Sequence, residues 1–549
     1  MRSQIAEGAV LEFQKLLGVQ SVIFKKTAEE LYGTSTLGLH AAIPIALKPH
    51  DRGEVIGIIR IASKYKISLY PISTGNNWGY GSANPVSPGS VVVDLSQLNR
   101  IIAFDKQLGL VTLEPGVTQS QLRQFLDKEG HRFLVEVTGG GGGCSIIGNA
   151  LERGHGASGY VDRFDSIRSL EVVLADGTLY RSSFADQGSG YFKWGTGPYL
   201  DGLFAQSNLG IVVSATIALT RKSERIEVCA LALKRGKSLR DLIDVSSTLL
   251  SELGDSVVSI RIQHIALLST RIVKYPKEAL VDGMIPESFF KIIAKDRHLT
   301  DWFVLIAIRG NRYTMPGVRT TLRKRMWGMT GWPIIFWNRS WVTRTQRLLD
   351  RISFLHTYAR MLRVLGSSLA GAEGATSSDR PGRLPYWKLL GGMSASEYRA
   401  FMGRYSLDPD DEARCGLIFY SGVVALKGAS VEQAVESIEA ICRAQGFDPL
   451  IGFSTFTEHS LYLALPLLFD RQNDAETKRA HACYRALAVA GNTHGYPLYR
   501  AGIHAMDMVV DMDHPFWQTA EKIKKALDPD NIMSPGRYSK YKAPHEDQL

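Results

Sequence analysis

The stretch TGGGGGCSIIGNALERGHG, residues 138–156, opens with five consecutive glycines and then places a cysteine beside an apolar pair. A glycine loses more backbone freedom on folding than any other residue, at a cost of roughly 0.5–1 kcal/mol relative to alanine. A run of five indicates that something approaches this backbone so closely that side chains are excluded. The fold must therefore bring a second surface, or a ligand, against this segment.

A second glycine-rich loop, PISTGNNWGYGS, occupies residues 71–82 and directly follows an apolar segment that predicts a strand. Its small and amide residues can turn the chain so that successive backbone N–H groups form an anion-binding nest. Neither loop is a Walker A sequence, and neither carries the G-x-G-x-x-G that opens a nicotinamide-binding helix. Two separated nests suit a long, doubly phosphorylated ligand with a flat ring, but tight structural turns would explain either loop as well.

The composition is that of a soluble globular protein with more than one lobe. The chain has 549 residues, 45% hydrophobic and 21% charged, which is too long for one ordinary core. The five cysteines lack the spacing of a disulfide framework or a zinc site, so we expect no metal and a reducing, cytoplasmic compartment. The N-terminus reads as an amphipathic helix without the apolar core of a secretory signal, and no apolar run is long enough to span a bilayer.

The net charge of +10 is spread thinly along the chain. Nucleic-acid binding would favour basic clusters interleaved with exposed aromatic residues in a known module, and no such module occurs. We therefore expect no nucleic-acid partner. A general attraction for anionic ligands or an acidic partner agrees better with this charge.

Short apolar runs alternate with helical patterns from about residue 43 to Lys222, and Asp176-Gly177 marks a hairpin. Beyond this point the helical segments are longer. The pattern predicts an α+β protein of two lobes whose C-terminal tail returns to the first lobe. The expected segments are an N-terminal helical segment (1–39), a first domain (40–222), a second domain (223–500) and a C-terminal segment (501–549).

Several motifs resemble the flavoprotein family of vanillyl-alcohol oxidase and 4-cresol dehydrogenase (p-cresol methylhydroxylase). They include YPISTGNNWGYGSANP, GNALERGHG, LEVVLADGTLYR and KWGTGPYLDGLFAQSNLGIV, and the resemblance resumes at YPLYRAGIHAMDMVVD and LDPDNIMSPGRYS. It covers most of residues 40–222 in nearly ungapped order. The resemblance implies a two-lobed FAD-binding PCMH-type fold with a mixed-sheet cap domain that binds substrate, and it implies FAD as cofactor.

The resemblance also implies which residues contact FAD. The first loop would wrap the pyrophosphate, the second would pass beside the isoalloxazine ring, and residues 210–212 would contact the adenosine half. The implied cofactor-binding residues are Pro71, Ser73, Thr74, Gly75, Asn76, Asn77, Gly79, Tyr80, Gly81, Gly139, Gly140, Gly142, Gly143, Cys144, Ser145, Gly148, Asn149, Glu152, Gly154, Gly210, Ile211, Val212, Arg500 and Arg537.

Three residues match the part of the family that holds a phenolate: Tyr80, Tyr499 and Arg500. An arginine flanked by phenolic hydroxyls is a sensible oxyanion site, because it favours deprotonation and stabilises negative charge. We interpret these three as the catalytic residues. The alternative is that Tyr499 and Arg500 only pack and pair internally.

Two family residues are missing on the substrate side. The third phenol-binding tyrosine would fall at Ala157, and the carboxylate near flavin N5 would fall at Gly140. Glu136 lies four residues earlier, and a rotated loop would be needed to bring it in. We therefore expect a more open pocket without a local carboxylate base.

Flavin attachment departs from the family as well. The residue tethered to the flavin would fall near Leu417, which cannot form such a bond, and Cys415 lies two residues away. Cys144 in CSIIG resembles the cysteine that other members of the wider fold bond to flavin C6, although a buried cysteine is more often inert. We favour noncovalent FAD, with a thioether through Cys144 as the alternative.

The segment 323–347 holds four of the nine tryptophans among many arginines. Aromatic residues beside cations suit a membrane interface. They equally suit internal packing, a subunit contact or a lid over the substrate entrance. The sequence leaves these alternatives open.

Together these observations predict a FAD-dependent oxidase or dehydrogenase that removes hydride from a C–H bond next to an electron-rich, 4-alkylphenol-like centre. The alternatives are a biosynthetic oxidase of a non-phenolic or carboxylate-bearing substrate and a non-catalytic flavin-binding partner subunit. Expected partners are an aromatic or anionic small molecule, an electron-acceptor protein and a second copy of the chain. Whether oxygen or a cytochrome-like protein reoxidises the flavin is left open.

Overall fold

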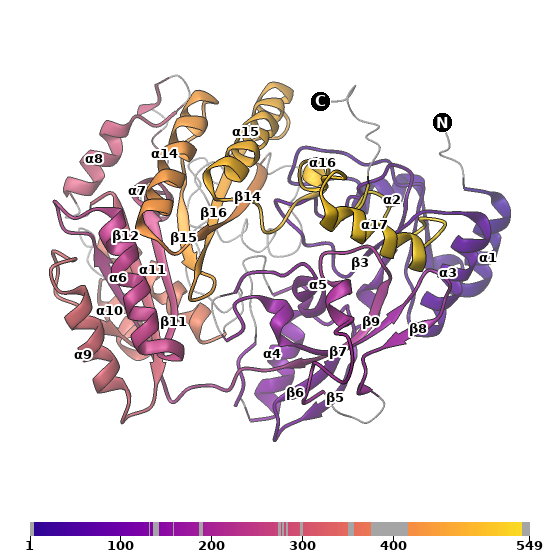
Figure 1. The fold of residues 1–549 in the computed structure, drawn as a ribbon, viewed down its shortest axis with the longest axis horizontal. Coiled ribbons are helices and arrows are strands. Elements are labelled where there is room, and N and C mark those ends of the chain that lie inside the picture. Colours follow the sequence, from indigo (N-terminus) through magenta and orange to yellow (C-terminus); the bar gives the residue numbers. More distant parts are fainter. Residues whose placement is uncertain are drawn as a thin grey trace. The chain divides into compact units, whose positions relative to one another are not determined.

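The computed structural model divides the chain into two compact units (Figure 1). The first unit comprises residues 1–156, 162–220 and 500–549, and the second comprises 157–161 and 221–499. Arg500 therefore belongs to the first unit, whereas its chain neighbour Tyr499 belongs to the second. The structure describes residues 5–130, 132–135, 142–156, 159–185, 190–272, 276, 279–281, 284–296, 300–349, 356–374 and 415–540.

The first unit begins with two helices that cover a small sheet. Helix α3 starts at Asp51, whose side chain accepts a hydrogen bond from the Glu54 backbone N–H and so caps the helix. Its apolar face, which includes Ile58 and Ile59, is buried in the same cluster as Phe13 of α1. The N-terminal helical segment is thus part of this unit's core.

The small sheet has the strand order β1-β2-β4-β3 and is mixed, because β1 pairs antiparallel with β2 while β2 and β3 pair parallel with β4. Residues near the C-terminus extend it: Leu69 of β3 donates to the Ile532 carbonyl and accepts from the Ser534 N–H. Strand β3 ends at Ile72, so the first glycine-rich loop leaves the sheet at a fixed edge.

A second sheet in this unit has the order β5-β6-β9-β7-β8, and its strand pairs are all antiparallel. The predicted hairpin at Asp176-Gly177 is confirmed, since β7 and β8 pair directly. Gly177 takes a φ of 81°, a conformation that favours glycine, and the Asp176 carboxylate accepts from the Thr178 N–H. The helices and strands of the first unit are α1 (Glu7–Leu17), β1 (Val22–Phe24), α2 (Lys25–Tyr32), β2 (Ile45–Leu47), α3 (Arg52–Tyr65), β3 (Leu69–Ile72), β4 (Val91–Asp94), β5 (Ile101–Asp105), β6 (Leu110–Leu113), α4 (Gln119–Lys128), α5 (Ile146–Leu151), β7 (Ile167–Val173), β8 (Leu179–Arg181), β9 (Ile211–Ala218), α16 (Met506–Val509) and α17 (Pro515–Leu527).

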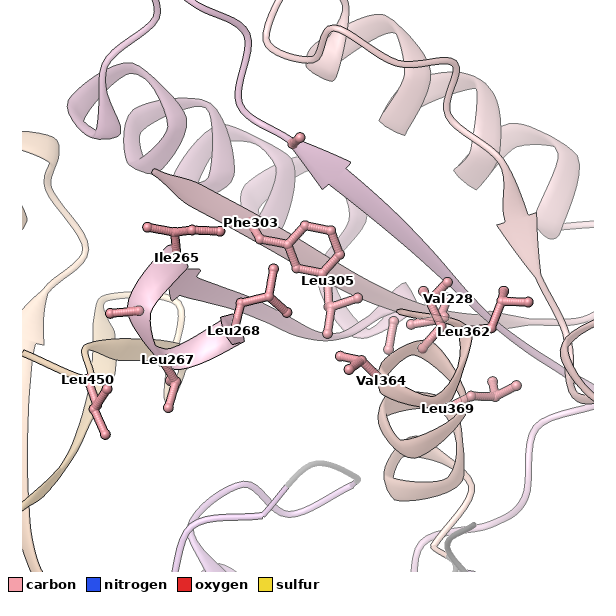
Figure 2. Packing of buried hydrophobic residues seen from close by; sticks show 14 of the residues in the cluster. Val228, Ile265, Leu267, Leu268, Phe303, Leu305, Leu362, Val364, Leu369 and Leu450 are labelled. Carbon is pink, nitrogen blue, oxygen red and sulfur yellow. The ribbon is translucent and has the colours of Figure 1, made fainter. Parts of the chain in front are cut away.

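The second unit is built on a seven-stranded sheet of order β13-β10-β12-β11-β15-β16-β14. Each strand pair described in it is antiparallel, so the mixed pairing expected for this domain occurs instead in the four-stranded sheet of the first unit. Apolar side chains from β10, β12, α7 and α11 gather into one cluster, with Phe303, Leu305 and Leu362 among them (Figure 2). The helices and strands of the second unit are β10 (Arg225–Ala232), α6 (Leu239–Leu253), β11 (Val257–His264), α7 (Ile265–Ile272), α8 (Glu287–Asp296), β12 (Trp302–Gly310), α9 (Met315–Met326), β13 (Phe336–Trp337), α10 (Arg339–Leu349), α11 (His356–Ala372), β14 (Cys415–Ala425), α14 (Gly428–Ala444), β15 (Gly452–Thr455), β16 (Ser460–Asp470) and α15 (Asp474–His494).

Within the described part of the chain, no helix combines the length and the apolar character needed to cross a bilayer.

Candidate functional site

The two glycine-rich loops meet in the first unit. The Ser145 N–H donates to the Thr74 hydroxyl at 3.2 Å, and the Asn76 side-chain amide donates to the Gly143 carbonyl at 3.1 Å. The thiol of Cys144 lies 3.9 Å from the Asn76 carbonyl oxygen. Loops separated by about seventy residues in the chain are therefore held edge to edge by three polar contacts.

The first loop presents backbone donors. Gly75 has a φ of 69°, and the Asn77 N–H closes a tight turn onto the Gly75 carbonyl at 2.9 Å. The N–H groups of Thr74, Gly75 and Asn76 donate to no acceptor among the described residues. Consecutive backbone N–H groups around a left-handed glycine form an anion-binding nest, and such groups require a partner. The predicted nest is thus available to a phosphate.

Close packing between the loops explains two of the glycines. Ser145 caps helix α5 by accepting from the Gly148 N–H at 2.9 Å. A side chain at Gly148 would overlap the Ser73 hydroxyl. A side chain at Gly154 would overlap the Asn149 amide, so the Asn149 side chain would have to move to admit it.

A buried ion pair lies beside these loops. Glu152, which follows α5, accepts a hydrogen bond from the Arg537 guanidinium, and Arg537 also donates to the Tyr70 hydroxyl at 2.9 Å. Burial alone would lower the pKa of Arg537, but the Glu152 carboxylate holds it above its usual value. Burial raises the pKa of the Tyr70 and Tyr538 phenols, which keeps both neutral.

Arg500 joins the same network. Its guanidinium lies 4.2 Å from the centre of the Tyr80 ring and donates to the Asn77 side-chain oxygen at 2.5 Å. Its Nε is 3.9 Å from the second carboxylate oxygen of Glu152. Two guanidinium groups, those of Arg500 and Arg537, therefore share one carboxylate. Their positive charges attract anionic groups.

Tyr499 belongs to the second unit. Its ring packs against Phe456 at 5.1 Å and edge-on against Tyr462 at 5.5 Å between centroids. Its backbone N–H donates to the Ser421 carbonyl on β14. The structure thus brings Tyr80 and Arg500 together, and it holds Tyr499 in an aromatic group of its own.

Residues 210–212 have a structural explanation of their own. A side chain at Gly210 would lie 2.8 Å from the Val173 carbonyl oxygen of β7. Ile211 and Val212 pair with β7 and point into two different apolar clusters. Their side chains therefore serve packing, and a contact of this segment with the adenosine half of FAD stays a prediction.

Several expectations lie outside the described residues. Glu136, Gly139, Gly140 and Ala157 belong to this set, as does the side chain of Cys415. Leu417 is described: its side chain is buried in the apolar cluster of the second unit. The remaining predicted cofactor-binding residues not discussed above are in the first unit, namely Pro71 on β3, Gly79 and Gly81 in the first loop, and Gly142 before Gly143.

Sequence reasoning missed three contributors. Tyr70 and Tyr538 flank Arg537, and the Thr36 hydroxyl accepts from the Gly79 N–H at 2.7 Å. A tyrosine inside an apolar strand carries no mark of a buried cation, and a threonine distant in the chain carries no mark of a loop contact. The sequence offers a signal only for the Thr36 contact, because a glycine at position 79 predicts that another part of the chain approaches the loop backbone closely.

Comparisons with known proteins support the fold and an FAD-binding domain. Residues 43–183 match the family model described as an FAD binding domain. The chain is 30% identical to 1'-carboxy-chondrochloren decarboxylase from Chondromyces crocatus, over 98% of each chain. It is 24% identical to the 4-cresol dehydrogenase [hydroxylating] flavoprotein subunit from Pseudomonas putida, over 96% of this chain and 94% of that one. The solved structure of p-cresol methylhydroxylase with substrate bound is similar in fold, with a TM-score of 0.81, 24% identity and 97% of both chains covered. The α+β, PCMH-type fold expected from the sequence is confirmed.

Proposed function

The chain belongs to the FAD-dependent oxidoreductase family of vanillyl-alcohol oxidase and 4-cresol dehydrogenase, and from this premise we propose that it removes hydride from a C–H bond beside an electron-rich centre. The proposed substrate is a small aromatic molecule of the 4-alkylphenol type, bound as its phenolate. The observation that carries this proposal is the Arg500 guanidinium, which is held between the Asn77 side chain and the face of the Tyr80 ring.

The residues of the first unit fit FAD. The nest formed by Thr74, Gly75 and Asn76 offers backbone donors to a pyrophosphate, and Gly148 keeps side chains out of the space beside Ser73. Bound FAD would supply an acceptor for one hydride, that is, for two electrons and a proton. Noncovalent binding remains our proposal, with a thioether through Cys144 as the alternative.

Arg500 is the proposed anion-stabilising residue. Its charge is fixed in place by Asn77 and by the face of the Tyr80 ring, so no reorganisation is needed when substrate charge develops. The arginine would favour the phenolate over the phenol, and an electron-rich phenolate releases hydride more readily. Tyr80 is proposed to donate a hydrogen bond to the same oxygen, and the catalytic role of Tyr499 stays a proposal that rests on the resemblance alone.

A second candidate substrate bears a carboxylate. It is favoured by the relative named as a decarboxylase, which matches this chain over its whole length. Arg500 would then bind the carboxylate in a bidentate manner. Loss of a hydride and of CO2 from adjacent carbons leaves a carbon–carbon double bond, so the same hydride acceptor would serve this reaction.

The partners stay proposals as well. One relative is named a flavoprotein subunit, which supports an electron-acceptor protein as the reoxidant. A second copy of the chain and a cytoplasmic location rest on the sequence argument alone.

The two substrate classes can be separated by anaerobic mixing while flavin absorbance is followed. A 4-alkylphenol should bleach the flavin and its methyl ether should not, because the ether cannot form a phenolate. If the carboxylate class is correct, an acid should bleach the flavin with release of CO2 and its ester should not. A non-catalytic flavin-binding subunit would be bleached by neither class, and that outcome would overturn the proposal.

A further inference from the structure

The segment 309–349 of the second unit has an unusual charge pattern. It contains nine lysine and arginine residues, no aspartate or glutamate, and four of the nine tryptophans. It comprises the end of β12, helix α9, strand β13 and helix α10. The guanidinium of Arg323 on α9 lies 4.9 Å from the ring of Phe336 on β13, and α10 begins two residues after β13. These elements are therefore neighbours.

The structure divides the apolar residues of this segment between two sides. Trp332 and Trp337 pack against the apolar cluster of the unit. Trp327 and Trp341 do the opposite, with 86% and 64% of their surface exposed. Internal packing, one of the interpretations left open by the sequence, thus accounts for only half of the tryptophans. Ile335 and Leu348 are exposed as well. We call the exposed residues of 309–349 the basic surface.

The cations of the basic surface are only partly neutralised. Three arginines pair with carboxylates from outside the segment, in the pairs Arg319–Glu227, Arg325–Glu252 and Arg339–Glu373. The other exposed cations form no ion pair with any carboxylate that the structure describes. They are Arg312, Arg323, Lys324, Arg344 and Arg347.

We propose that the basic surface docks on an anionic lipid membrane. Exposed tryptophans insert at the level of lipid headgroups, and exposed arginines and lysines gain from the negative surface potential of such membranes. On α10 the two kinds of side chain share a helix face, because Trp341 and Arg344 lie three residues apart. A symmetric contact with a second copy is disfavoured, because it would bring together two sets of cations that pair with no described carboxylate.

The flavin-loaded, full-length protein can be tested by co-sedimentation with vesicles. It should bind phosphatidylcholine vesicles that contain roughly a quarter phosphatidylglycerol, and it should bind pure phosphatidylcholine weakly. Raising the salt from about 50 mM to about 500 mM should remove most of the binding, because the charges are exposed. These measurements on the unmodified protein do not depend on any variant folding.

Two variants of the basic surface test its residues. R344Q/R347Q should weaken binding to the anionic vesicles by about tenfold or more at low salt, because each basic residue near the membrane contributes. Insertion of the exposed tryptophans into the vesicle surface should shift their fluorescence emission to shorter wavelength. W327S/W341S should weaken binding and abolish this blue shift. The matched control is K193Q/W194S in the first unit, where a lysine lies 4.6 Å over an exposed tryptophan ring. This control should bind as the unmodified protein does.

Three outcomes would overturn the proposal. The first is equal binding to neutral and anionic vesicles. The second is binding that both variants leave unchanged while they retain flavin and native circular dichroism. The third is an absence of vesicle binding together with self-association that W327S/W341S removes, which would assign the basic surface to a second copy of the chain.

Discussion

The two units use their interiors differently. The first unit holds the buried Arg537 in an ion pair with the partly buried Glu152, and it keeps three loop N–H groups free of acceptors among the described residues. The interior of the second unit is mostly apolar, with fully buried side chains of the seven-stranded sheet such as Ile306 and Leu465, although the Glu227 carboxylate of β10 is buried as well. Buried charge and open donors are costly unless something uses them, whereas buried apolar area stabilises a fold directly.

This difference shows which unit restricts its amino-acid sequence more strongly. The glycine-rich loops and the charged cluster of the first unit tolerate few residue types at each position. The charge, the side-chain length and the backbone conformation must all suit the contacts that are made there. An apolar sheet tolerates many residues, since hydrophobic side chains of similar volume replace one another at small cost. Substitutions in the first unit should therefore act through charge and ligand. Substitutions among the apolar side chains of the second should act through burial.

The largest effect should come from Glu152→Ala. Removing the carboxylate leaves Arg537 buried without its counter-charge, which typically costs about 3–5 kcal/mol of unfolding free energy. Urea unfolding followed by flavin fluorescence measures this loss. The neighbouring pair Arg153–Asp162 is the matched control: Arg153 is half exposed, so Arg153→Gln should cost about 1 kcal/mol or less. Equal losses for the two variants would show that burial of the ion pair is unimportant.

Arg500→Ala should act on turnover more than on stability. Negative charge on the substrate supports hydride loss, and removal of one preorganised donor typically slows reaction by about 10²–10³. Tyr499→Phe should cost less, because the arginine charge remains. Stopped-flow reduction of the flavin with a true substrate checks both variants. Reduction of the Arg500→Ala protein at the unmodified rate would contradict the proposed role of Arg500.

His264 should make the stability of the second unit depend on pH. Its side chain is mostly buried on β11, with the Trp302 ring at 5.2 Å and Glu439 at 4.0 Å, and the charges of Arg443 and Glu287 act on it. Burial lowers the pKa of His264 to about 4. As pH falls below about 6.5, the unfolded chain binds this proton first, so stability present at pH 7 is lost by about 3 kcal/mol as pH approaches 4.

The measurement is the unfolding free energy between pH 7 and pH 4, followed by tryptophan fluorescence. His264→Gln should flatten this dependence, and the same change at the exposed His459 is the control. If the two variants respond alike to acid, buried His264 is not the source of the acid sensitivity.

The first unit could be predicted well where local chemistry decides the structure. The turn at Asp176-Gly177 and the helix that begins at Asp51 both carry residues that only one local conformation favours. The link between Glu152 and Arg537 could not be predicted, because 385 positions separate the two residues and no local pattern marks a buried pair.

The second unit could be predicted only as a set of elements. The apolar runs of β14 and β16 predict strands, but their place in the sheet depends on tertiary packing that periodicity does not encode. The same limit explains the tryptophans: partly buried Trp337 and exposed Trp341 lie four residues apart in one sequence context. Trp337 packs against the apolar cluster because it lies on β13, which pairs with β10 of the sheet, whereas Trp341 lies on helix α10.

Gly75→Ala should have a smaller effect, confined to the first unit. At a φ of 69° an added Cβ costs about 1–2 kcal/mol, and here it would also lie 3.3 Å from Ala83. FAD affinity, measured by flavin fluorescence, should fall with stability. Gly317→Ala in α9 is the opposite case, because its Cβ meets nothing within 4 Å and the backbone is helical, so it should stabilise by about 0.5–1 kcal/mol. If both substitutions changed the unfolding free energy in the same direction, the contrast between the units would be wrong.

The smallest effect should come from Cys144→Ala. The thiol is buried and lies 3.9 Å from the Asn76 carbonyl oxygen, so we expect the residue to behave as a small apolar group between the two loops. If FAD is held by the backbone nest and the shared charges alone, acid precipitation should release the flavin from both the unmodified protein and the variant. Flavin that stays with the unmodified protein and leaves the variant would instead establish a thioether at Cys144. Flavin that stays with both would assign the bond to another residue, such as Cys415, and the backbone cradle would then not be the only attachment.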